Sequence, residues 1–328
     1  MKEYLFHFVF IIYSLLIYKY RIKISAALGI MDLPDNIRKS HFSPISASGG
    51  FIIFPYILSS LIYLNILSHI KLKILLISAF LYASFFFTGL IDDKIYLSAK
   101  SKTFILLFVL FILIPLDKSL LVSYLAFKDI NWFILLNQGS LFFTIFSIYF
   151  FYNALNFADG LNGISITLCL YFVLAILFAN NVFNIFYLSI LISLLFALIP
   201  NLFGKIFLGN SGVSFLSILI SILFIENYNK NYIFFDEIAL IVFLPTLDAT
   251  RVAIERILNG SSPFSSDKNH FHHLLLKIFE KKYVFLPYLI FAIMPYAASK
   301  IYLPTYISFV IFSFAYFLIL VFLKKKSV

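Results

Sequence analysis

Charged residues are scarce in this 328-residue sequence: Asp, Glu, Lys and Arg together make up 12% of it. A soluble domain usually carries roughly 25%. Hydrophobic residues account for 62% of the chain and aromatic residues for 20%, and the mean hydropathy is +1.00. A water-soluble globule is therefore excluded, and the composition indicates helices that cross a lipid bilayer.

Cysteine is almost absent as well, because Cys169 is the single cysteine and lies inside an apolar run. This count excludes both a disulfide framework and a zinc site built from cysteines. The start of the chain lacks a small-residue cleavage site, and the acidic Glu3 follows Lys2. We therefore expect the first apolar stretch to be a membrane span rather than a removable signal.

Eleven apolar runs are bounded by charged or turn-forming residues, and several are shorter than 18 residues, which leaves their boundaries soft. The sequence predicts an all-α integral membrane protein with about 10–11 transmembrane helices, forming a single polytopic membrane domain over residues 1–328. The runs are Tyr4–Tyr18, Gly49–Ser68, Leu72–Ile91, Thr103–Leu116, Phe133–Tyr152, Ile164–Ala179, Val182–Phe203, Val213–Ile225, Ile238–Leu258, Val284–Ala298 and Leu303–Leu323.

Lys and Arg residues set the predicted orientation, because cytoplasmic loops are enriched in them. With the N-terminus outside, 18 of the 25 Lys and Arg residues fall on the cytoplasmic side, as does the C-terminus. The longest polar segments, Lys19–Ser48 and Arg251–Tyr283, also fall there. In a membrane protein, basic residues set the topology and contact anionic headgroups or phosphates, which accounts for the net charge of +10. We therefore expect no nucleic acid partner. We expect a multi-pass protein of the inner (plasma) membrane with its active site facing the cytoplasm.

Two adjacent carboxylates, Asp92 and Asp93, end the third apolar run and precede Lys100 and Lys102. Neighbouring negative charges repel each other and resist burial unless a cation holds them. Magnesium prefers oxygen ligands and takes phosphate as a co-ligand, so it meets this need. The alternative is an acidic helix end that is solvated by water.

Asparagine, aspartate and glycine are concentrated between the fifth and sixth runs, where Asn153, Asn156, Asp159 and Asn162 lie close together. Because successive runs alternate in direction, this loop lies on the same predicted face as Asp92. Amide and carboxylate side chains with two glycines suit a tight loop that approaches a ligand. A plain turn between helices is the alternative, although a turn requires one Asp-Gly or Asn-Gly pair and this loop has two.

Histidine is concentrated in one cytoplasmic segment, where His270, His272 and His273 are three of the six histidines in the chain. Imidazoles donate to phosphate groups or act as acid or base near neutral pH. A histidine zinc site and a solvated polar loop are the alternatives, and the zinc site has no cysteine beside it.

Two more cytoplasmic segments carry groups that suit phosphate. The glycine-rich segment Pro200–Gly212 contains Lys205 and Asn210, and exposed amides with a lysine can bind phosphate oxygens. A plain glycine turn is its alternative. In the first loop, Lys39 and His41 could neutralise a lipid phosphate, but basic residues at this place also serve as topology signals.

Five ordered motifs resemble those of the polyprenyl-phosphate N-acetylhexosamine-1-phosphate transferases, the membrane family that includes the initiators of lipid-linked sugars and the phospho-MurNAc-pentapeptide transferase. The initiators that use UDP-HexNAc look closer than the pentapeptide branch. The motifs run from about Pro34 to His273: Pro-Asp-x-x-Arg-Lys-x-His with a later Gly-Gly, Asp-Asp with a downstream Lys, Asn-x-x-Asn-x-x-Asp-Gly-x-x-Gly, Phe-x-Gly-x-x-Gly, and His-x-His-His.

The resemblance implies transfer of a HexNAc-type sugar-1-phosphate from a UDP-sugar to polyprenyl (undecaprenyl) phosphate, with release of UMP, as the first step of lipid-linked glycan synthesis for cell-wall polymers or lipopolysaccharide. It implies Mg²⁺ as the cofactor, with Mn²⁺ as the alternative. Membrane lipids are expected partners, and a homodimer is left open. The implied catalytic residues are Asp92, Asp93 and Asp159, and the implied metal ligands are Asp92, Asp93 and Asn210. The implied substrate-binding residues are Lys39, His41, Lys100, Lys102, Asn153, Asn156, Asn162, His270, His272 and His273.

One residue departs from the family pattern, since the loop before the eighth run usually reads Gly-Asp-x-Gly and this chain has Asn210. An amide oxygen coordinates magnesium without supplying charge, so the site should bind metal more weakly or recruit Asp248 or Asp267. Two other functions therefore stay open. One is a catalytically impaired member that binds lipid or nucleotide sugar, and the other is a transporter of lipid-linked sugars, although the charged residues lie at span ends rather than at mid-membrane.

Overall fold

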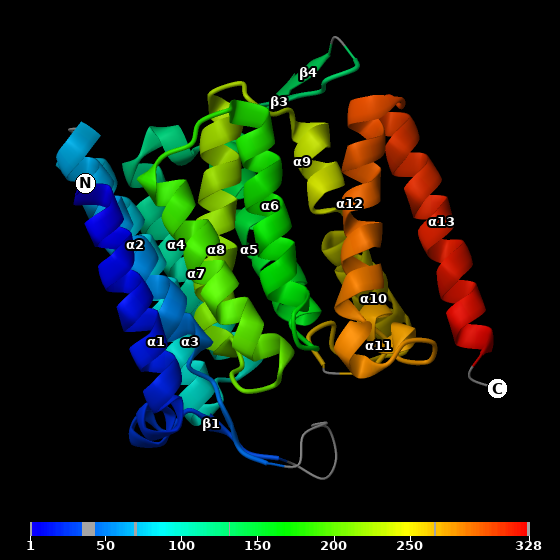
Figure 1. Ribbon diagram of the computed structural model, residues 1–328. Coiled ribbons are helices and arrows are strands. Elements are labelled where there is room, and N and C mark those ends of the chain that lie inside the picture. The colour runs from blue at the N-terminus through cyan, green and yellow to red at the C-terminus, as the bar shows by residue number, and fades with distance from the viewer. Residues whose placement is uncertain (1, 35–42, 69–70, 131, 266, 327–328) are drawn as a thin grey trace. The chain divides into compact units, whose positions relative to one another are not determined.

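The structure is a computed structural model that describes residues 2–34, 43–68, 71–130, 132–265 and 267–326 (Figure 1). Within this described part, nine helices are long and apolar enough to cross a membrane, and the strands form only two-stranded pairs. The expected all-α membrane architecture is confirmed. The chain divides into two compact units, Met1–Asp117 with Val182–Leu219, and Lys118–Asn181 with Ile220–Val328.

The first unit is built on α2, which packs along α7 and also contacts α1 and α3, while α3 packs on α4. The short strands β1 and β2 pair antiparallel between α1 and α2. The elements are α1 (Lys2–Leu28), β1 (Met31–Asp32), β2 (Ile45–Ser46), α2 (Gly49–Ser68), α3 (Leu72–Ile95), α4 (Ala99–Leu113), η1 (Ile114–Leu116), α7 (Ile185–Leu202) and the first half of α8 (Gly209–Asn229).

The second unit places α5 against α10 and α6, and α12 against α6, α9, α10 and α13; α12 and α13 run side by side in Figure 1. The β3–β4 hairpin projects at the end of this unit opposite α11. The elements are η2 (Lys118–Leu120), β3 (Tyr124–Ala126), β4 (Phe133–Leu135), η3 (Asn137–Gly139), α5 (Ser140–Ala158), α6 (Ile164–Asn180), the second half of α8, α9 (Phe235–Ile241), α10 (Phe243–Leu258), α11 (Phe271–Leu275), η4 (Lys281–Tyr283), α12 (Phe285–Ile301) and α13 (Thr305–Lys325).

The predicted span Ile238–Leu258 is two helices rather than one. α9 has 7 residues and α10 has 16, and the break falls at Val242. Pro245 explains the break, because proline lacks an N–H and its ring clashes with the carbonyl four residues earlier, which is that of Ile241, the last residue of α9. α6 has 17 residues and is the one predicted span that forms a shorter apolar helix within the described residues.

Two helix ends also extend beyond their predicted limits. α1 continues past Tyr18 through three basic residues that the sequence placed in a loop, Lys19, Arg21 and Lys23. Lys and Arg favour helices and keep their charged ends in water while their stems lie along apolar surface. α3 likewise continues to Ile95. The aspartate pair therefore lies inside the last turns of a helix, which fixes the direction of both side chains.

Candidate active site

Asp92 lies in the last turns of α3 and is held by two contacts from the following segment. Its Oδ1 accepts a hydrogen bond from the backbone N–H of Leu97 at 2.8 Å, and its Oδ2 pairs with the Lys102 ammonium at 2.8 Å. Lys102 projects from the first turn of α4, whose start is capped by the Ser98 hydroxyl. The structure thus joins Asp92 to one of the two predicted lysines, whereas Lys100 is exposed.

Asp93 is a helix cap supplied by a neighbouring helix. Its Oδ1 accepts the backbone N–H of Asn210 at 2.7 Å, and its Oδ2 accepts that of Ser211 at 3.0 Å, at the start of α8. A carboxylate at this place satisfies two N–H groups that have no partner within the helix and favours the positive end of the helix dipole. Such a cap contributes about 1 kcal/mol.

A close approach of two backbones makes the cap geometry achievable. A Cβ atom added at Gly89, one turn before Asp93, would lie 2.3 Å from the Asn210 carbonyl oxygen. Only glycine therefore lets the end of α3 lie this near the start of α8. Gly209, at φ +76°, gives the turn that leads into α8.

The donor set Asp92, Asp93 and Asn210 has the chemistry that magnesium requires. All three side chains offer oxygen, and each carboxylate oxygen of the two aspartates has a second lone pair beyond the hydrogen bond described above. Mg²⁺ keeps several waters and needs only one or two carboxylates plus substrate phosphate. Among the described residues, no group of three or more His, Cys, Asp or Glu side chains is placed to hold a metal ion. These residues therefore fit a metal that the substrate phosphates complete.

In the second unit, the predicted Asn-Asp-Gly loop connects α5 to α6. Asp159 ends α5 and its Oδ1 accepts a hydrogen bond from the Ser165 hydroxyl in the first turn of α6. The Asn153 amide nitrogen donates to the Tyr149 carbonyl oxygen at 2.8 Å in its own helix. Asn156 and Asn162 are half-buried. The loop is thus a short turn between two helices, and the first turn of α6 holds the Asp159 carboxylate in place.

His272 packs directly on this turn. A Cβ atom added at Gly160 would lie 2.3 Å from His272 Nε2, so the turn must have glycine there. The ring is 0% exposed, and within the described part of the chain neither of its nitrogens has a hydrogen-bond partner. Burial, with the nearby His273 and His270, lowers the pKa of His272 well below its usual range, so the ring is neutral. An unsatisfied neutral imidazole beside a carboxylate turn is suited to a polar ligand atom.

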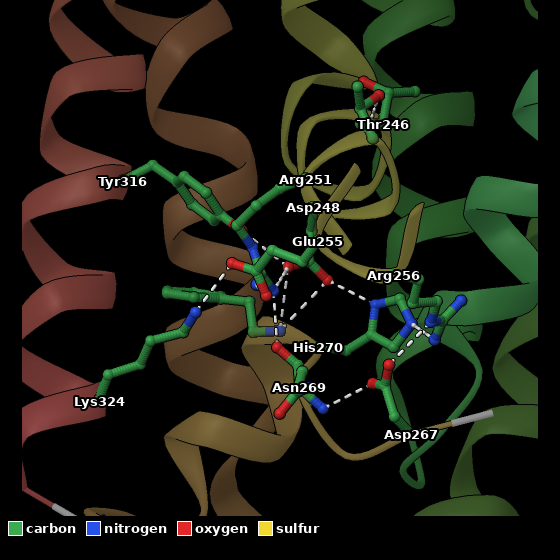
Figure 2. Close-up of polar contacts among 12 residues, drawn as sticks. Thr246, Asp248, Arg251, Glu255, Arg256, Asp267, Asn269, His270, Tyr316 and Lys324 are labelled. Atoms are coloured by element: carbon green, nitrogen blue, oxygen red, sulfur yellow. Dashed lines mark hydrogen bonds and ion pairs between the residues drawn. The ribbon is translucent and has the colours of Figure 1, made fainter. Parts of the chain in front are cut away.

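Asp248 of α10 is the hub that holds the histidine segment (Figure 2). Its Oδ2 pairs with His270 Nδ1 at 2.9 Å, and its Oδ1 accepts from Arg251 Nη2 at 2.8 Å and from the Tyr316 hydroxyl at 2.7 Å. Both oxygens also lie within hydrogen-bond distance of the Phe271 N–H, at 3.1 and 3.2 Å. A carboxylate has about four lone-pair sites, so these contacts leave none for a metal. Asp248 is a positioning residue, and it does not replace the missing aspartate at position 210.

Arg256 holds in place the segment that precedes the histidines. Its Nε pairs with Asp267 Oδ2 at 2.7 Å, its Nη1 donates to the Pro263 carbonyl at 2.7 Å, and its Nη2 lies 3.3 Å from His270 Nε2. Since guanidinium only donates, His270 accepts at Nε2 and donates from Nδ1 to Asp248. Although burial acts in the opposite direction, the Arg256 hydrogen bond holds the pKa of Asp267 below its ordinary value. Asp267 is thereby fixed in place by Arg256.

The two segments of the second unit meet through rings as well as through His272. The Arg256 guanidinium lies over the Phe157 ring, 5.4 Å from its centroid, and the same ring lies 5.4 Å from that of His270. The rings of His270 and His272 stack with their centroids 5.7 Å apart, and the His273 ring is tilted against that of His272 at 4.2 Å. The structure therefore brings Asp159 and the three histidines into one cluster within the second unit.

Sequence reasoning missed three residues of this cluster, namely Arg251, Arg256 and Tyr316. The spacing of Asp248, Arg251 and Glu255 by three and four residues in an apolar run was a usable signal for a charged helix face. Tyr316 lies 68 residues after its partner Asp248 and has no local signal. The predicted ligands Lys39 and His41 lie outside the described residues.

Comparison with known proteins finds one family model that matches part of the chain. The model of the glycosyl transferase family 4 matches residues 74–227, a segment that contains Asp92, Asp93, Asp159 and Asn210. The chain resembles this family over the matched segment, which is slightly less than half of its length. The histidine cluster lies beyond the matched segment, and its contacts with the Asp159 turn connect it to the matched part.

Curated relatives match this chain over most of its length. It is 28% identical over 262 residues, 77% of this chain and 72% of the relative, to a probable undecaprenyl-phosphate N-acetylglucosaminyl 1-phosphate transferase of Bacillus subtilis. It is 25% identical over 267 residues, 78% of this chain and 71% of the relative, to an undecaprenyl-phosphate alpha-N-acetylglucosaminyl 1-phosphate transferase of Salmonella typhi. The Escherichia coli K12 protein of the same name is 24% identical over 320 residues, 90% of this chain and 84% of the relative.

Proposed function

We propose that this protein transfers N-acetylglucosamine-1-phosphate from UDP-N-acetylglucosamine to undecaprenyl phosphate and releases UMP. The observation that carries the proposal is that the family 4 match contains all three predicted catalytic aspartates. The relatives named above are described as transferases of this kind. The sugar, the inner-membrane location and the cytoplasmic face of the site are parts of the proposal, supported by those names and by the charge distribution.

The reaction needs neutralised phosphates more than it needs an activated nucleophile. An oxygen of the acceptor phosphate forms a bond to the phosphorus that carries the sugar, and the bond from that phosphorus to the UMP oxygen breaks, so that UMP leaves with the electron pair. Direct attack requires alignment alone. In a two-step route, an aspartate oxygen would first bond to the sugar-bearing phosphorus as UMP leaves, and the acceptor phosphate oxygen would then displace the aspartate. In either route, fixed positive charges and donors stabilise the transferring group.

Each unit carries groups that suit phosphate chemistry. In the first unit, Asp92, Asp93 and Asn210 are proposed to hold the magnesium that would neutralise the diphosphate, and Lys102 is proposed to bind substrate. In the other unit, the neutral His272 next to the Asp159 turn is proposed to meet a phosphate oxygen as a donor. His270, fixed in one tautomer between Asp248 and Arg256, orients the stacked His272 rather than acting as a free base.

The substrate is tested by a panel of UDP-sugars with purified protein and undecaprenyl phosphate in vesicles. We expect UMP release and a lipid-linked product with UDP-N-acetylglucosamine, at least about tenfold faster than with UDP-glucose, because a buried site built for an amide rejects analogues that lack it. Asp159→Asn is the matched negative variant, since the amide keeps the shape and can still accept from Ser165. Equal rates for the two sugars would contradict the assignment of the acetamido sugar.

The asparagine at position 210 predicts a specific metal dependence. Chelation should abolish turnover and Mg²⁺ should restore it, and the Asn210→Asp variant should reach half-maximal activity at a lower Mg²⁺ concentration, because a carboxylate adds charge to the ligand set. The measurement is a Mg²⁺ titration of initial rates for both proteins. Activity in Asn210→Asp alone would show that the natural chain has lost turnover, and activity insensitive to chelation would remove the metal from the mechanism.

A further inference from the structure

The β3–β4 hairpin of the second unit carries an outward apolar surface that the proposed reaction does not use. Trp132, Phe133 and Leu135 are each about 60% exposed, and Ile130 is 44% exposed. We refer to these four residues as the hairpin patch. Phe133 and Leu135 lie on β4, which pairs antiparallel with β3 in the register Tyr124↔Leu135, Leu125↔Ile134 and Ala126↔Phe133, and Ile130 and Trp132 lie in the connection before β4.

The hairpin is fixed to the helices beneath it. Tyr228 of α8 donates from its hydroxyl to the Tyr124 carbonyl oxygen and accepts from the Ala126 N–H, both at 2.8 Å. The Tyr124 hydroxyl donates to the Asn231 side chain at 2.8 Å. The Trp132 ring stacks on Phe127 at 6.1 Å, and Phe127 in turn lies against Phe235 of α9. The patch is therefore carried by a hairpin that contacts with α8 and α9 hold in place at one end of the helices.

Charge is directed away from the patch. Lys128 and Asp129 are the only charged residues between Lys118 and Asp159. The Lys128 ammonium lies 3.3 Å from the buried carboxylate of Glu237, and Asp129 Oδ2 accepts the backbone N–H of Thr305 at 2.6 Å, at the start of α13. Both charges are thus tied to the helix ends.

The patch continues into a surface that lipid must cover. β4 leads through η3 into α5, on which Phe142 and Phe146 are each 65% exposed. α5 lies in one of the membrane-length apolar helices, so these phenylalanines face acyl chains. Tryptophan at the end of such a face is the residue type that favours the boundary between headgroups and acyl chains.

We propose that the β3–β4 hairpin lies in the bilayer interface, with Trp132, Phe133 and Leu135 inserted among phospholipids at the headgroup–acyl boundary. The partner is the lipid surface itself. The hairpin then acts as an anchor that fixes the depth of the second unit in the membrane. This inference is independent of the proposed function, because none of its residues belongs to the site.

Trp132 is the only tryptophan in the chain, so its fluorescence reports on the hairpin alone. The test uses the full-length protein in phosphatidylcholine–phosphatidylglycerol vesicles that carry bromine either close to the headgroup or deep in the acyl chain. We expect the shallow bromines to quench most of the Trp132 emission, the deep bromines to quench less, and aqueous acrylamide to quench little. The double variant Trp132→Phe, Phe146→Trp is the depth control and should show the reverse order of the two bromolipids.

Two results would overturn the proposal. Strong quenching by acrylamide with none by bromolipid would place the hairpin in water. Resistance to both quenchers, with a dependence on the protein-to-lipid ratio, would show that a second copy of the chain covers the patch instead of lipid.

Discussion

Replacing Gly160 by alanine is expected to lower the turnover number by about 100-fold, the size of effect that a misplacement of about 1 Å has in a catalytic site. The added methyl group would lie 2.3 Å from His272 Nε2, and the ring is fully buried with no room to retreat. The turn that carries Asp159 must therefore move away from the histidine cluster. The measurement is the initial rate of UMP release, with correct folding checked by the thermal transition in detergent.

A matched glycine provides the control for this substitution. A Cβ atom at Gly139, in η3, meets nothing within 4 Å, so Gly139→Ala should keep normal activity. The cause of the loss is separated by the double variant Gly160→Ala, His272→Ala, which should be no worse than His272→Ala alone, because removal of the ring removes the clash. Normal turnover in Gly160→Ala would show that the Asp159 turn and His272 do not need this contact.

Asp248→Asn is expected to have the largest effect on stability, about 3 kcal/mol, because it removes the more buried of the two carboxylates that pair with the Arg251 guanidinium and leaves Glu255. Asp248 is 3% exposed and Arg251 is 6% exposed, so water cannot compensate. The same change removes the acceptor that fixes the tautomer of His270. We expect a lowered thermal transition together with a raised KM for the UDP-sugar, measured on the same preparation.

Two further variants decide whether the network works as a unit. Glu280→Gln breaks the exposed ion pair with Lys282, 3.2 Å apart, and should leave the thermal transition unchanged. Tyr316→Phe removes one donor to Asp248 and should raise KM less than Asp248→Asn does, while the double variant should show coupling between the two. Additive effects of Asp248→Asn and Tyr316→Phe would mean that α13 does not help to position the histidines.

The helices could be predicted from sequence wherever an apolar run ended at charged residues. Burying a charge in lipid is costly, so a membrane-spanning helix ends close to such residues. The exception is the break between α9 and α10. Pro245 marks it in the sequence, but the apolar run continues across the break and led to the prediction of a single helix. The ion pair between Asp92 and Lys102 could also be predicted, because the two residues are only ten positions apart in the sequence.

Contacts that depend on tertiary packing could not be predicted. Nothing local shows that Gly160 and His272, more than a hundred residues apart, share one van der Waals contact. Asp93 illustrates a different limit, because a carboxylate that caps a helix and one that binds a metal have the same sequence signature. Asp248 was considered as a substitute metal ligand, and only its full set of hydrogen bonds shows that it is a positioning residue.

The fate of the sugar-linked phosphorus decides what kind of transferase this is. Purified protein in vesicles with undecaprenyl phosphate would be given UDP-N-acetylglucosamine labelled with ³²P at the phosphate that carries the sugar. If the chain transfers a sugar-1-phosphate, the label moves into the lipid fraction in a one-to-one ratio with released UMP, and Asp159→Asn does not transfer it. Label retained in water-soluble UDP while the sugar appears on the lipid would contradict phosphoryl transfer altogether.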